Sequence, residues 1–156
     1  MEIKALKLFK SHSDSRVAFL FGCIKMKNKM RKITVNNIVY LYRIQSKYYG
    51  DNRAVVTLKI YMDGCRNAPY IMGFQCFEGN YDGAVLAVGT TVFNTQTHLT
   101  EYVNLHRPYF VRLCILKALE EGWDASEKQV NNDGMQFLSE LNLDISKIMP
   151  KATQIE

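Results

Sequence analysis

The sequence predicts an α+β fold: an antiparallel sheet of about five strands, with one main helix packed on one face and a short C-terminal helix. Two patterns support this. Between residues 33 and 104, β-branched, aromatic and alternating runs are separated by short turns, so consecutive strands should pair antiparallel. After Pro108 the apolar residues recur at three- and four-residue spacing instead, which indicates a helix that covers one face of the sheet.

The first strands lie in residues 32–62. The run KITVNNIVYLYRIQ places two strands around Asn36 and Asn37, and because Asn tolerates positive φ, a tight two-residue hairpin is expected there. A turn follows at residues 46–53. The next strand alternates strictly. One face of it carries Ala54, Val56, Leu58, Ile60 and Met62, and the other carries Val55, Thr57, Lys59 and Tyr61.

Three more segments are predicted as strands. Residues 68–83 begin with Pro69 close to the strand start and end in a Gly-Asn-Tyr-Asp-Gly turn. Residues 84–94 and 97–104 follow, and the second of them alternates more clearly. All of these segments are expected to belong to the same antiparallel sheet.

The main helix should begin at Pro108 and end before Gly122. If Glu121 is the C-cap, then Gly122 and Trp123 complete a Schellman ending, and Trp123 folds back near Ala118. The face toward the sheet is predicted from helical spacing: Val111, Cys114, Ile115, Ala118 and Leu119.

Beyond that helix the pattern is weaker. Asp124 and Glu127 resemble a capping pair for a short helical turn, and residues 130–134 read as a loop. Residues 135–148 fit either a strand or a second helix. Helix is favoured because four apolar residues share one helical face: Phe137, Leu138, Leu141 and Ile145.

Length and charge define the predicted domain organisation. A chain of 156 residues, 47% apolar and 22% charged, has the composition of one globular domain. Residues 1–32 hold nine basic and two acidic side chains, net +7, whereas the other 124 residues hold 11 basic and 13 acidic, net −2. We therefore expect a basic N-terminal extension (1–29), a single α+β domain (30–145) and a C-terminal tail (146–156).

Three interpretations compete for the N-terminal extension. As a polyanion-binding arm it offers Lys25, Lys27, Lys29, Arg31 and Lys32. As an export signal it has a short apolar run, and Cys23 follows a sequence that resembles a lipoprotein cleavage site. It could also be a leader that the fold does not need, ahead of a start at Met26 or Met30.

The four cysteines, Cys23, Cys65, Cys76 and Cys114, are scattered without a C-x-x-C pair. Free thiols in a reducing cytoplasm are the expected state. A disulfide between Cys65 and Cys76 across neighbouring strands would require an oxidising compartment. No apolar run approaches the roughly 18 to 20 residues of a membrane-spanning helix.

The search for chemistry assigns no catalytic residue, metal ligand or cofactor. Glycine-rich phosphate loops, G-x-S-x-G and H-E-x-x-H are absent from the sequence. His98, Glu101 and His106 could converge on a metal only if the fold overrides their strand spacing. A small Cys/His enzyme remains an alternative, which would need Cys65 or Cys76 to share a cleft with one of these histidines.

Tyrosine is the residue type that hints at a binding surface, with nine copies. Tyr40 and Tyr42 share a strand face, Tyr48 and Tyr49 flank a turn, and Tyr61 points outward from the next strand. Because tyrosine is enriched at interface anchors, these five are the predicted partner-binding residues. Base stacking and plain strand propensity are the alternatives.

Residues 30 to about 138 resemble a loose group of small uncharacterised bacterial proteins. The likeness is carried by the start MRKITVNNIVYLYR and by ALEEGWD at residues 118–124; this chain has Ala125 where the group commonly has Pro. The resemblance implies a non-enzymatic protein-binding module, of the immunity or accessory type found in bacterial conflict systems. The alternative is a nucleic-acid-binding accessory protein that uses the basic N-terminal extension.

Overall fold

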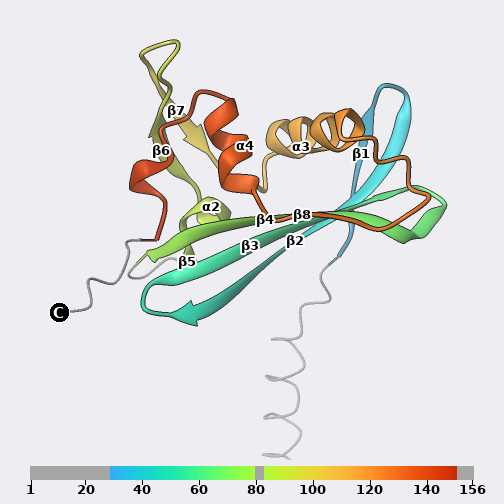
Figure 1. Cartoon of the computed structure of the whole chain (residues 1–156), viewed down its shortest axis with the longest axis horizontal. Coiled ribbons are helices and arrows are strands. Elements are labelled where there is room, and N and C mark those ends of the chain that lie inside the picture. Colours follow the sequence, from blue (N-terminus) through green and yellow to red (C-terminus); the bar gives the residue numbers. More distant parts are fainter. Residues whose placement is uncertain (1–28, 80–82, 151–156) are drawn as a thin grey trace, which may run out of the picture.

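The main sheet is an antiparallel meander whose turns follow from the local sequence. The computed structural model describes residues 29–79 and 83–150. Its first strands pair in chain order: β1 (Arg31–Val35), β2 (Ile38–Gly50), β3 (Arg53–Met62) and β4 (Cys65–Gly79) (Figure 1). Asn36 and Asn37 have φ of 50° and 63°, which confirms the predicted two-residue hairpin.

Two short strands extend this sheet beyond β4. β5 (Gly83–Ala84) pairs antiparallel with Glu78 and Gly79, and β8 (Gln129–Asn131) pairs parallel with residues 70–72. The prediction of a loop from residue 130 is therefore wrong at β8. Its three residues are mostly polar, and they form a strand only because the chain returns alongside β4 after the main helix.

The segment 84–94 is not one strand of the main sheet, as was predicted. It forms α2 (Val85–Val88) and, after Gly89, β6 (Thr90–Phe93). Within residues 29–79 and 83–150, β6 pairs only with β7 (Thr100–Val103), in a second, two-stranded sheet. Leu86 is fully buried and its carbonyl accepts a hydrogen bond from the amide of Leu105, so the helical turn anchors the base of the β6–β7 hairpin.

α3 (Pro108–Glu120) ends as the sequence predicts. The amide of Trp123 donates to the Ala118 carbonyl at 3.0 Å, and the amide of Gly122 donates to the Leu119 carbonyl at 3.1 Å. These two bonds, with Gly122 at φ 85°, define a Schellman ending. Trp123 is buried and its indole Nε1 donates to the Ala68 carbonyl at 3.1 Å, which ties the helix end to the start of β4.

The C-terminal segment is helical, as the apolar spacing favoured. α4 (Gly134–Glu140) is followed by the 3₁₀ helix η1 (Ile145–Lys147), and Ile148 is buried with its carbonyl bonded to the Phe77 amide. The predicted helical turn at Asp124 is wrong. The Asp124 carboxylate instead accepts hydrogen bonds from the amide and the hydroxyl of Ser126, which closes an Asx turn.

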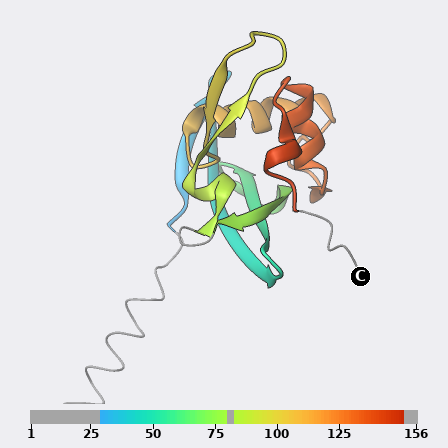
Figure 2. The same cartoon turned by 90° about the vertical axis from the view of Figure 1, so that its left-hand side faces the viewer.

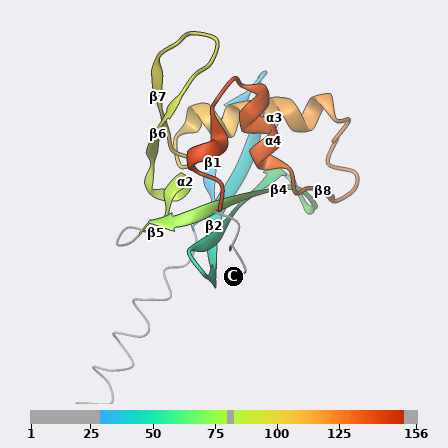
Figure 3. The same ribbon diagram turned by 60° about the vertical axis from the view of Figure 1, so that its left-hand side comes forward.

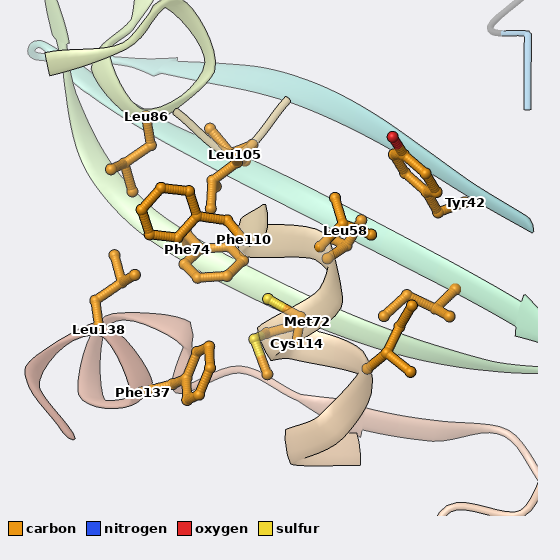
Figure 4. Close-up of a cluster of buried hydrophobic side chains, with 14 of the residues drawn as sticks. Tyr42, Leu58, Met72, Phe74, Leu86, Leu105, Phe110, Cys114, Phe137 and Leu138 are labelled. Carbon is orange, nitrogen blue, oxygen red and sulfur yellow. The ribbon is translucent and has the colours of Figure 1, made fainter. Parts of the chain in front are cut away.

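The core lies between one face of the sheet and the helices. Alternate residues of β2, β3 and β4 point toward α3 and α4 and are buried there, together with side chains of both helices, among them Leu58, Phe74, Cys114 and Leu138 (Figure 4). α3 and α4 both lie on this side of the sheet, and the described residues place no helix on the other side (Figures 1 and 3). The α+β prediction is confirmed, with one sheet face covered and one open.

Candidate functional site

Tyr40 and Tyr42 do not belong to a surface. They share a face of β2, as predicted, but it is the core face, and their exposures are 0% and 3%. The ring of Tyr40 lies 6.2 Å from that of Trp123. The strand period shows which residues share a face, whereas the position of α3 decides which face is buried. The prediction that these two tyrosines contact a partner is corrected accordingly.

The other three predicted tyrosines are exposed or partly exposed, but they do not form one patch. Tyr48 and Tyr49 lie at the end of β2, at 49% and 54% exposure, and the Lys47 ammonium is 4.9 Å from the centre of the Tyr49 ring. Tyr61 is half-buried near the end of β3, opposite Leu41. The register therefore separates Tyr61 from Tyr48 and Tyr49 by most of the length of the β2–β3 pair.

The predicted polyanion-binding residues lie at the edge of the described structure. Lys25 and Lys27 fall outside the described residues, as does Cys23, whereas Lys29, Arg31 and Lys32 are exposed. Arg31 Nη1 donates to the His106 carbonyl at 3.3 Å, and Lys32 Nζ lies 3.9 Å from an Asp63 carboxylate oxygen. Two of the five cations are thus partly engaged within the fold, and polyanion binding by this set stays a prediction.

The residues considered for catalysis or metal binding lie on separate elements. His98 is in the loop of the β6–β7 hairpin, His106 precedes α3, and Cys65 and Cys76 lie on β4. Within residues 29–79 and 83–150, no group of three His, Cys, Asp or Glu side chains is placed to hold a metal ion. Burial, with a smaller contribution from the positive charge of Arg31, lowers the pKa of His106. Burial raises the pKa of the Cys76 thiol, which is inaccessible in the core.

Cys65 and Cys76 cannot form the disulfide that the sequence left open. Both are on β4, eleven residues apart, so a rise of about 3.3 Å per residue separates them by more than about 30 Å. A disulfide requires Cα atoms within about 7 Å. The sequence suggested two neighbouring strands, but β4 is a single long strand.

Exposed apolar side chains concentrate instead on the β6–β7 hairpin and the adjoining start of α3. Of the ten large apolar residues that are exposed in the described part of the chain, five lie between residues 88 and 109. We call these five the hairpin patch: Val88 (43% exposed), Phe93 (42%), Leu99 (66%), Tyr102 (42%) and Tyr109 (60%). The hairpin projects beyond the helices, so its outer face is open (Figure 2).

The register explains why the outer face of the hairpin is apolar. Thr91 pairs with Tyr102 and Phe93 pairs with Thr100, so Phe93 and Tyr102 are diagonal neighbours on one face. The opposite face carries Val92 and Val103, which are buried in the core. Sequence reasoning missed Phe93 and Tyr102 because it assigned both strands to the main sheet, where a neighbouring strand or helix would have covered them.

Tyr102 is fixed in place by its neighbours. Its hydroxyl donates to the Val88 carbonyl at 3.1 Å, and the Arg107 guanidinium lies 4.4 Å from the centre of its ring. The side-chain nitrogen of Asn104 donates to the same carbonyl at 3.0 Å. Gly89, at φ 110°, lies directly beneath the Tyr102 hydroxyl, where a Cβ would overlap it. The ring and the guanidinium are therefore held in one arrangement at the surface.

The hairpin loop is braced internally by Asn94, a buried polar residue. Its side-chain carbonyl accepts from the amides of Gln96 and Thr97, at 2.9 and 3.1 Å, and its side-chain nitrogen donates to Glu101 at 2.5 Å. Each of these polar groups would be costly to bury without a partner. The side chain thus closes the loop that presents Leu99.

The segment after α4 holds the hairpin from the other side. The Thr95 amide donates to the Asn142 carbonyl at 2.8 Å, and the Asp144 amide donates to the Phe93 carbonyl at 2.8 Å. The Asn142 side chain also donates to Gln96 Oε1 at 3.0 Å. The hairpin is therefore held by hydrogen bonds to a segment that lies about 50 residues later in the sequence. This bracing pre-organises the hairpin patch for contact with a partner.

Comparisons with protein-family models, with curated proteins and with solved structures found no match to this chain. None of the helices in the described ranges is long and apolar enough to cross a membrane. The site must therefore be interpreted from its own geometry and charge.

Proposed function

We propose that this chain is a non-enzymatic binding module that contacts a protein partner through the hairpin patch. The observation that supports the proposal is that exposed apolar and aromatic side chains lie on the projecting β6–β7 hairpin and on the adjoining ends of α2 and α3, and that hydrogen bonds hold the hairpin in place. Exposed apolar patches of this kind commonly mark interaction sites.

The composition of the patch fits a protein partner. Tyr, Phe and Arg are enriched in the cores of protein interfaces, where a few well-packed anchors contribute most of the affinity. Tyr102, with Arg107 over its ring, and Tyr109 on the first turn of α3 are anchors of this type. Because the hairpin is already ordered by its own hydrogen bonds, little conformational entropy is lost on binding.

The more specific form of the proposal is an immunity-type or accessory role in a bacterial conflict system, which rests on the resemblance of residues 30–138 described above. A cytoplasmic location is part of the same proposal and rests on cysteine usage. Cys65, Cys76 and Cys114 are free thiols, and two of them are buried.

The test is affinity capture of partners by the full chain from the cells that express it. We compare the unaltered chain with a patch variant, Leu99→Ser/Tyr109→Ser, and with a control, Ile38→Ser/Val130→Ser. The control removes two apolar residues that are also exposed, at 41% and 50%, but lie outside the hairpin patch. We expect a stoichiometric partner whose affinity for the purified patch variant is at least about tenfold weaker, because interface anchors contribute more than about 1 kcal/mol each.

Binding of that partner to the control variant should be unchanged. A partner that binds the patch variant as tightly as the unaltered chain would contradict the assignment of the hairpin patch. Small-molecule turnover by the chain, without any stoichiometric partner, would contradict the binding-module function itself.

A further inference from the structure

The sheet face that points away from α3 and α4 is strongly basic. We call it the outer face; it consists of the side chains of β1–β4 that alternate with the buried ones. Its cations come from three adjacent strands: Lys32 on β1, Arg43 and Lys47 on β2, and Arg53 and Lys59 on β3. In Figures 1 and 3 this face is the lower surface of the sheet, on the side away from the hairpin patch.

No outward-pointing position of β1–β4 in the described structure holds an Asp or Glu. Two carboxylates lie in the turns at the two ends of the face. A carboxylate oxygen of Asp51 lies 3.7 Å from Arg53 Nη2, and a carboxylate oxygen of Asp63 lies 3.9 Å from Lys32 Nζ. The cations in the middle of the face form no ion pair with a carboxylate among the described residues, so their charge is not neutralised by a neighbour.

Two of these central cations are placed directly against each other. Arg43 on β2 is the cross-strand partner of Lys59 on β3. Like charges that are directly opposite in a sheet are destabilising. In addition, Arg43 Nε is buried by its neighbours and has no hydrogen-bond partner among the residues that the structure describes. An anion bound over this pair would remove the repulsion.

Aromatic side chains accompany the cations along the outer face. Tyr61 is two residues beyond Lys59 on the same face of β3. At the other end, Tyr49 and Arg53 line a surface hollow of about 310 Å³ together with Val55, Gln75 and Pro150. Between them Gly73, opposite Thr57, presents no side chain, and Asn132 lies against it. The face is thus a basic surface with an aromatic ring near each end.

We propose that the outer face binds single-stranded nucleic acid. The phosphates contact Arg43, Lys47 and Lys59, and unpaired bases stack on Tyr61 and enter the hollow beside Tyr49. Stacking on aromatic side chains combined with a basic track is how sheet surfaces hold single strands, and both elements are present here. In a duplex the faces of the bases are occupied, so the two tyrosines could not be used. An acidic protein surface would satisfy the cations but not the stacking positions.

The test measures fluorescence anisotropy of a labelled deoxythymidine dodecamer with the full chain, at salt concentrations from about 50 to 200 mM. A uridine dodecamer and a duplex of the same length serve as comparison probes. We expect both single strands to bind at least about tenfold more tightly than the duplex. We also expect the logarithm of the affinity to fall linearly with the logarithm of the salt concentration.

The variant that tests the phosphate contacts is Arg43→Gln/Lys59→Gln. Removing two contacts should weaken binding by about tenfold or more and reduce the salt slope by about 1.4, because each contact to a single strand contributes about 0.7. The matched control, Arg112→Gln/Lys117→Gln, removes the same net charge from α3, on the covered side of the sheet, and should bind as the unaltered chain does. The Arg43→Gln/Lys59→Gln variant should unfold at the same temperature as the unaltered chain or higher, since it removes a like-charge pair.

A second variant, Tyr61→Leu, tests stacking. It should weaken binding of both single strands by roughly fivefold to 100-fold and leave the salt slope unchanged, because the leucine removes a stacking platform but no charge. Replacing Leu99 and Tyr109 in the hairpin patch by Ser should leave oligonucleotide binding unaltered.

Three results would overturn the proposal. Tighter binding of polyglutamate than of either single strand would assign the face to an acidic protein. Equal binding of heparin and the dodecamers, unaffected by Tyr61→Leu, would reduce it to unspecific attraction of polyanions. Loss of binding in a Lys25→Gln/Lys27→Gln/Lys29→Gln variant, with full binding by Arg43→Gln/Lys59→Gln, would place the contact on the N-terminal basic residues instead.

Discussion

At the scale of single residues, the core contains two tyrosines with similar packing and different hydrogen bonding. Tyr40 and Tyr70 are both fully buried, and both rings lie about 6 Å from Trp123, at 6.2 and 5.9 Å. The Tyr70 hydroxyl donates to Glu121 at 2.6 Å, whereas the Tyr40 hydroxyl is buried without a partner in the described part of the chain. Burial raises the pKa of both, and the bond to Glu121 raises that of Tyr70 further.

Replacing each tyrosine by phenylalanine should therefore have different effects on stability. Tyr40→Phe removes an unsatisfied hydroxyl and should leave the free energy of unfolding unchanged or raise it by up to about 1 kcal/mol. Tyr70→Phe removes a hydrogen bond to a carboxylate and should lower it by about 1 kcal/mol or more. Urea denaturation of the two variants measures the difference, and a larger loss for Tyr40→Phe would show that its hydroxyl has a partner in solution.

At the scale of elements, one glycine follows the C-terminus of α3 and another begins α4, and each position requires glycine for a different reason. Gly122 has φ 85° with open space around it, so its requirement comes from the backbone alone. Gly134 has an ordinary φ, but a Cβ there would lie 2.6 Å from the Gly73 carbonyl oxygen and from the Phe74 ring. The start of α4 therefore rests directly on β4.

We expect both glycine-to-alanine changes to destabilise the fold. Gly122→Ala should cost about 1–2 kcal/mol because alanine must adopt the left-handed conformation. Gly134→Ala should cost about 1–3 kcal/mol through overpacking, and it should also shift α4. Denaturant unfolding gives the two costs, and near-ultraviolet circular dichroism should change only for Gly134→Ala. A neutral Gly134→Ala variant would contradict the close packing of α4 on β4.

The elements that local patterns determine were predicted from the sequence. The Asn36-Asn37 hairpin and the Gly122-Trp123 helix ending depend on residues a few positions apart, and both are confirmed. α2, β8 and the separation of the β6–β7 hairpin depend on contacts between distant segments, which alternation and propensity do not encode. The burial of Tyr40 and Tyr42 was missed for the same reason, because a strand's period does not indicate which of its faces a helix will cover.

In the candidate sites too, features set by local sequence patterns were predicted, and features set by contacts between distant segments were not. The outward placement of Lys59 and Tyr61 was predicted correctly from the alternation in β3. The pairing of Lys59 with Arg43 needed the register of two strands, which the sequence alone does not define. The hairpin patch could be suspected at one position only: Tyr109 lies three residues before Arg112, on the polar side of α3.

At the scale of the whole molecule, buried thiols and phenols should make the fold sensitive to alkaline pH. Burial raises the pKa of Cys114 from 9.0 to about 12, and the pKa values of Cys76, Tyr40 and Tyr70 shift in the same direction. These groups ionise more easily in the unfolded chain. Their contribution to stability is therefore complete below pH 9.0, the ordinary thiol pKa, and is lost as the pH rises toward 12.

We expect the free energy of unfolding to fall above pH 9.0, by up to about 1.4 kcal/mol per pH unit for each buried thiol. The Cys114→Ala variant should show a shallower decline, whatever its stability at neutral pH. Thermal unfolding between about pH 7 and pH 11 measures both curves. Parallel curves for the variant and the unaltered chain would show that Cys114 is not protected from ionisation by burial.

The molecule as a whole presents the two proposed binding surfaces on opposite sides of one core. The hairpin patch is apolar and braced by the C-terminal segment, and the outer face is basic and open (Figures 1 and 2). Neither surface requires a catalytic group. The central claim is that the hairpin patch is where a protein partner binds.

Hydrogen exchange of the chain, free and bound to its captured partner, tests this claim most directly. Binding should slow amide exchange in β6, β7 and the first turn of α3, and should leave the β2–β3 turn around Asp51 unchanged. Protection confined to that turn or to β1, with unaltered exchange from Thr90 to Val103, would contradict the account.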